Sequence, residues 1–162
     1  MEKEELRTIY QRTERLTVVV LLLALPLFGL VYLYQQSGSL SGIASILPTW
    51  VQYLLLGVGI LLLVLQYLFF HQKIKKSFEQ VSLLEKLGLY ASATRQRFML
   101  LLVVSIISTA GLLWSGSAGF VFLFTVTLVF FSLGKPSPDR MVRLMKLKKE
   151  DRELLTEISR PA

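Results

Sequence analysis

Four long apolar runs, separated by polar segments, dominate the chain of 162 residues. None of the runs contains Asp, Glu, Lys, Arg or His, and they comprise residues 16–34, 50–70, 98–114 and 118–133. A helix needs roughly 17–25 apolar residues to cross a bilayer, and it must be a helix because lipid cannot satisfy unpaired backbone N–H and C=O groups. The pattern therefore predicts four transmembrane helices, the fourth of which falls just short of this range.

The predicted fold class is an all-α membrane protein, a single domain over residues 1–162 in which the four transmembrane helices form two antiparallel hairpins. A basic helical tail, residues 135–162, follows the last of them. The segment before the first run is long and holds acidic residues, so we expect that run to be a retained helix rather than a cleaved signal peptide.

The composition agrees with a membrane protein. Hydrophobic residues make up 53% of the chain and charged residues only 18%, whereas a soluble domain carries about 25% charge. This balance disfavours a soluble enzyme, a disordered chain and a nucleic-acid-binding domain. Because the chain has no Cys, disulfides and thiolate metal ligands are excluded.

The charged residues indicate which side of the membrane each segment occupies. All 18 Lys and Arg residues lie in the N-terminal segment, the loop 71–97 or the tail 135–162, and the connections 35–49 and 115–117 carry no charge. Basic residues accumulate on the cytoplasmic side of membrane proteins. The sequence thus predicts a multi-pass protein of the bacterial inner membrane with both termini in the cytoplasm. The net charge of +7 then reflects the membrane topology and favours binding to anionic lipid. It does not indicate binding to nucleic acid.

The two predicted hairpins resemble each other. Tyr10 precedes the first run and Tyr90 precedes the third, while Ser77 follows the second run and Ser137 the fourth. Since both hairpins begin on the same side, a duplication would give a parallel tandem repeat, unlike the inverted repeats of many transporters. Chance similarity between Leu-rich helices is an equal alternative.

The second half of the chain resembles a group of small, uncharacterised bacterial membrane proteins with four helices. The resemblance is carried by the segment 87–90, the segment 95–100, the short second hairpin and the sequence Lys135-Pro136-Ser137-Pro138-Asp139 with the leucines that follow. It covers residues 84–155 well, and the first half only as a hydropathy profile. The resemblance implies a compact protein of the cytoplasmic membrane and no activity, cofactor or catalytic residue, because none is established for the group.

The loop 71–97 is long enough to be ordered. Ile74, Phe78 and Val81 recur at helical spacing, which predicts that the second helix continues past the membrane and ends near Gly88.

The tail contains a strong helix start at Ser137-Pro138-Asp139, with a capping Ser and a Pro at the first helical position. Met141, Leu144 and Met145 share one face of this short helix, so we expect it to lie on the membrane surface. We expect a further helix from about Lys149 to pack within the chain, and the alternative is a partner protein.

The candidate binding residues are four arginines next to the apolar runs: Arg95, Arg97, Arg140 and Arg143. Long basic side chains can extend along apolar surface and place their charge among headgroups, and each gains about 1 kcal/mol near anionic lipid. We expect them to anchor the chain to anionic headgroups on the cytoplasmic side.

The sequence offers no candidate for catalysis or for a metal or cofactor. The apolar runs lack the ionisable residues that mark proton relays and ion pathways, and His71 is the single histidine. Ser105, Ser108 and Thr109 share one helical face, which serves either helix packing or a hydroxyl-lined path for a solute.

The favoured function is a non-enzymatic structural or accessory membrane component, acting alone, as a homo-oligomer or with another membrane protein. The alternative is a small channel or exporter for an uncharged or hydrophobic solute. A continuous polar cavity at Gln52, Gln66 and the Ser105 face would favour the channel, and a closely packed bundle would count against it for a single copy.

Overall fold

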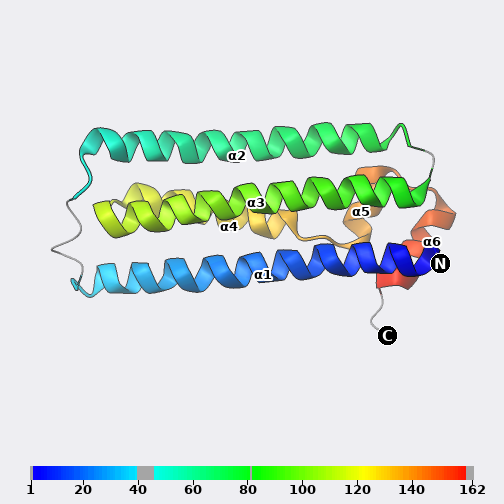
Figure 1. The fold of residues 1–162 in the computed structure, drawn as a ribbon, viewed down its shortest axis with the longest axis horizontal. Coiled ribbons are helices and arrows are strands. Elements are labelled where there is room, and N and C mark those ends of the chain that lie inside the picture. Colours follow the sequence, from blue (N-terminus) through cyan, green and yellow to red (C-terminus); the bar gives the residue numbers. More distant parts are fainter. Residues whose placement is uncertain (1, 40–45, 81, 160–162) are drawn as a thin grey trace.

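The computed structural model describes residues 2–39, 46–80 and 82–159, and all regular structure in them is helical. Four long helices lie side by side and two short helices pack at one end of them (Figure 1). The helices are α1 (Glu2–Gln36), α2 (Thr49–Ser77), α3 (Leu83–Ser115), α4 (Ala118–Gly134), α5 (Pro138–Met145) and α6 (Lys149–Ser159). The predicted all-α fold is confirmed.

Helix α3 is the centre of the bundle. It packs against α1, α2 and α4, and α1 and α3 run in one direction while α2 and α4 run in the other (Figure 1). The N-terminus, α5, α6 and the α2–α3 connection lie together at one end. We call this the charged end, because the three charged segments of the chain meet there.

Three helices, α1, α2 and α3, are long and apolar enough to cross a membrane, which identifies the chain as a multi-pass membrane protein candidate. Helix α4 has 17 residues, a length of about 26 Å at 1.5 Å per residue, against a hydrocarbon core of about 30 Å. It qualifies as a span only together with α5, from which it is bent by 84°. The described residues therefore hold three spans, or four if the bent pair counts as one.

Helices α1, α2 and α3 extend beyond the predicted apolar runs toward the charged end. Helix α2 stops at Ser77, where the Phe78 N–H bonds the Lys75 carbonyl in a tightened last turn. The prediction that it ends near Gly88 is wrong, since Gly88 lies inside α3. The helix tolerates this glycine because it sits among good helix formers. Val81, part of the same prediction, lies outside the described residues.

Two apolar clusters form the interior. The end cluster, at the charged end, joins α1, α2, α3, α5 and α6, and its buried residues are Leu6, Tyr10, Phe70, Ile74, Leu83, Leu87, Tyr90, Ala93, Met141, Met145, Leu155 and Ile158. The span cluster fills the bundle between the long helices, with Val20, Ala24, Phe28, Leu63, Phe98, Leu101, Val104, Leu112, Phe120, Leu123, Phe124 and Phe131.

The tail folds back onto the bundle. Ser137 accepts a hydrogen bond from the Arg140 N–H at 3.3 Å and caps α5, as predicted. The apolar face of α5 packs on protein, since Met141 and Met145 are at most 1% exposed and belong to the end cluster, and its position at the membrane surface stays a prediction. An amphipathic face looks the same in sequence whether lipid or protein covers it. Residues 160–162 of the predicted tail lie outside the described residues.

Helix α6 packs against α1, and the Lys3 ammonium pairs with the Glu157 carboxylate at 3.1 Å. The expectation of packing within the chain is therefore met.

Helices α1 and α3, the first helices of the two hairpins, are parallel. Tyr10 and Tyr90 are both buried in the end cluster, and Arg15 and Arg95 are both exposed. The two helices thus present equivalent positions to the interior, in agreement with the spacing in the sequence, while the duplication itself stays a prediction.

Candidate functional site

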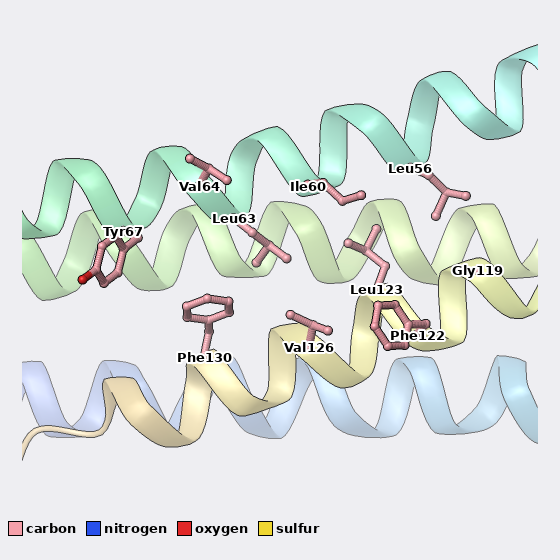
Figure 2. Close-up of a pocket in the computed structure, with 10 residues that line it drawn as sticks. All are labelled: Leu56, Ile60, Leu63, Val64, Tyr67, Gly119, Phe122, Leu123, Val126 and Phe130. Carbon is pink, nitrogen blue, oxygen red and sulfur yellow. The ribbon is translucent and has the colours of Figure 1, made fainter.

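A groove of about 690 Å³ runs between α2 and α4 on the outside of the bundle (Figure 2). Its lining is apolar apart from the Tyr67 hydroxyl, and comprises Leu56, Ile60, Leu63, Val64, Tyr67, Gly119, Phe122, Leu123, Val126 and Phe130. All ten belong to the parts of α2 and α4 predicted to lie within the membrane. The groove would therefore face hydrocarbon rather than water.

Glycines set the close approach of α2 to α4. A Cβ atom on Gly59 would lie 2.5 Å from a Leu123 methyl, and one on Gly119 would lie 3.0 Å from a Leu56 methyl. Because these positions lack side chains, the Leu123 side chain can pack directly on the α2 backbone and form the floor of the groove.

Tyr67 and Phe130 form the end of the groove nearest the charged end, and Arg97 of α3 lies against this end. Its Nη2 donates a hydrogen bond of 3.2 Å to the Phe130 carbonyl, and its guanidinium carbon stands 5.0 Å from the centroid of the Phe70 ring. Its charge also interacts with the Tyr67 side chain. The residue is only 5% exposed, and its Nε–H has no hydrogen-bond partner.

A second arginine, Arg140 of α5, lies near enough to Arg97 for the two positive charges to repel. Arg140 is half-buried. Among the described residues, neither arginine forms an ion pair with a carboxylate. The two arginines do not line the groove, but Arg97 contacts the backbone of Phe130 at its end.

The four arginines predicted from the sequence do not share one environment. Arg95 and Arg143 are exposed and Arg140 is half-buried, so their positions suit the expected contact with headgroups. Arg97 is buried under Phe70 instead of extending freely from the bundle, and the headgroup contact of the four arginines stays a prediction. The place of Arg97 next to the apolar run gave no sign of its burial, because the groups that cover it come from α2 and α4.

The polar side chains within the spans are closed off from solvent. Ser105, Ser108 and Thr127 are at most 1% exposed, and each hydroxyl donates to a carbonyl four residues earlier in its own helix. Gln66 is fully buried and its amide has no hydrogen-bond partner. Gln52 lies near the other end of the bundle and donates to the Leu47 carbonyl.

No protein-family model, curated protein or solved structure matches this chain. Within the described part of the chain, no three His, Asp or Glu side chains come together in a group suited to a metal ion. The groove was not predicted from the sequence, and the signal that could have indicated it is the pair of glycines, Gly59 and Gly119, on two neighbouring helices.

Proposed function

We propose that the chain is a multi-pass protein of the bacterial cytoplasmic membrane with a structural or accessory role and no catalytic activity. In this proposal both termini and the end cluster lie in the cytoplasm. The observation that carries it is the filling of the interior: apolar side chains occupy both clusters, and the buried hydroxyls of Ser105, Ser108, Thr109 and Thr127 each donate to a carbonyl of their own helix.

The distribution of charge supports the orientation. Basic residues of α1, the α2–α3 region and the tail gather at the charged end, while the connections at the opposite end carry no charged residue. A folded end cluster beside the bilayer also offers a surface with charges of both signs, which allows electrostatic complementarity with another protein.

The alternative function, a channel or exporter for an uncharged solute, gains no support from a single copy. Gln66 and the Ser105 face are sealed in packed helix contacts, and the groove between α2 and α4 is apolar and open to the side.

Purification in mild detergent tests the accessory role. A tag after Ala162 should recover either a second membrane protein or a homo-oligomer in fixed proportion. The purified chain, reconstituted in vesicles, should leave their permeability to glycerol unchanged. Recovery of the chain as a lone monomer that makes the vesicles leak glycerol would overturn the proposal in favour of a channel.

A further inference from the structure

We propose that the groove between α2 and α4 holds one acyl chain of an anionic phospholipid of the cytoplasmic leaflet, whose phosphate lies at Tyr67, Arg97 and Arg140. The proposal rests on the proposed membrane location and orientation, and it adds a defined ligand, a defined leaflet and a defined binding site.

The apolar part of the site suits an acyl chain. The groove extends from Leu56 and Gly119 to Tyr67 and Phe130 (Figure 2), and thus follows the long axis of the bundle, as lipid tails do. Ile60, Val64 and Phe122 on its rim are about half exposed or more, so nothing in the described chain covers it. Inside hydrocarbon, an unfilled groove would lose the dispersion contacts of its lining, and a flexible tail can restore them.

The polar part of the site lies where the headgroup of that lipid would be. The Tyr67 hydroxyl marks the end of the groove in Figure 2. Arg97 touches this end through the Phe130 carbonyl, and its Nε–H is left without a partner. A buried donor on a charged group without a partner is costly, and a phosphate oxygen is the acceptor that a guanidinium fits best.

The charges favour an anionic lipid over a zwitterionic one. Arg97 and Arg140 repel each other, and within the described part of the chain neither forms an ion pair with a carboxylate. A phosphate placed beside both removes that repulsion, and the half-buried Arg140 can reach a headgroup at the surface. The choline of a zwitterionic headgroup would bring a third positive charge to the same place.

Native mass spectrometry of the full chain, released from nanodiscs of equal phosphatidylglycerol and phosphatidylcholine, tests the proposal. We expect one phosphatidylglycerol to remain on each chain in preference to phosphatidylcholine. Arg140→Gln should lower the retained fraction about tenfold, because it removes a charge-assisted contact with the phosphate. Arg152→Gln, at an exposed position of α6, is the control and should retain the lipid.

The buried arginine is tested with a conservative variant. Arg97→Lys keeps the positive charge but loses the planar guanidinium group, and it should weaken retention of phosphatidylglycerol. Lys75→Gln removes an exposed charge of α2 and should not. Should the Arg97 variant fail to fold, Arg140→Gln still decides the question.

The apolar half of the site is tested by filling the groove. Val126→Trp places a large ring in the groove and should abolish retention, whereas Val129→Trp, at a position 53% exposed outside the groove, should not. Equal retention of both lipids, unchanged retention in Arg140→Gln and Val126→Trp, or a lipid-free dimer would each overturn the proposal. A reversed orientation would instead appear in topology labelling, so the two proposals fail separately.

Discussion

At the scale of single residues, glycines determine how closely the helices approach one another. Gly59, Gly111, Gly119 and Gly134 each face a side chain of a neighbouring helix where a Cβ would be crowded. The sequence shows glycines in apolar runs but not which of them face another helix. Gly29, Gly57 and Gly88 have nothing within 4 Å of the Cβ position, and nothing in the local sequence separates the two groups.

Gly111→Ala should destabilise the contact between α3 and α4. The added methyl group would meet the fully buried Phe120 ring, and such overpacking costs about 1–3 kcal/mol. Thermal unfolding in detergent, followed by loss of helical signal, measures the effect.

The control for this substitution is Gly88→Ala, also within α3, where the Cβ position is open. It should leave the stability unchanged or raise it, because Ala is a better helix former than Gly by about 1 kcal/mol. Equal melting temperatures for the two variants would contradict the packing described between Gly111 and Phe120.

At the scale of helices, the number and order of the four long helices could be predicted from the sequence. What each helix packs against could not. Long apolar runs without charge identify α1 to α4, and the capping sequence at Ser137 identifies α5. The sequence could not show that Met141 and Met145 pack on protein, since an apolar stripe gives no information on what covers it. Nor could it show that Arg97 lies beneath Phe70, because that contact joins residues of two helices.

Leu155→Ala should loosen α6 from the end cluster. Leu155 is fully buried, and truncation of a buried Leu costs about 2–5 kcal/mol. Hydrogen exchange of the α6 amides should become faster, while the amides of α3 within the span cluster keep their protection.

Glu157→Gln is the control for the same helix. It breaks the ion pair with Lys3, but both side chains are more than 60% exposed, and exposed pairs contribute about 0–1 kcal/mol. Faster exchange in this variant than in Leu155→Ala would mean that the ion pair, not the buried leucine, holds α6 in place.

At the scale of the whole molecule, the bundle has one charged and one uncharged end, and in the described residues the short helices and their cluster lie at the charged end. The absence of Cys makes this asymmetry easy to test, because any introduced thiol is the only one. The sequence predicts the orientation through its charges, whereas the groove between α2 and α4 depends on how the helices pack on α3 and could not be predicted.

Single cysteines at Ser39 and Thr156 should label differently in intact cells. Both positions are exposed and lie at opposite ends of the bundle. A maleimide that cannot cross the membrane should react with Ser39→Cys and should reach Thr156→Cys only after the cells are opened. Labelling of Thr156→Cys in intact cells would reverse the proposed orientation.

The short helix α4 has a consequence for the surrounding bilayer. Its 17 residues give a span about 4 Å shorter than a hydrocarbon core of about 30 Å, while α2 beside it has 29 residues. Such hydrophobic mismatch is relieved by local thinning of the bilayer or by tilting, at fractions of a kcal/mol per Å. The lipid layer is therefore expected to be thinnest along α4, and the protein to favour thin membranes over thick ones.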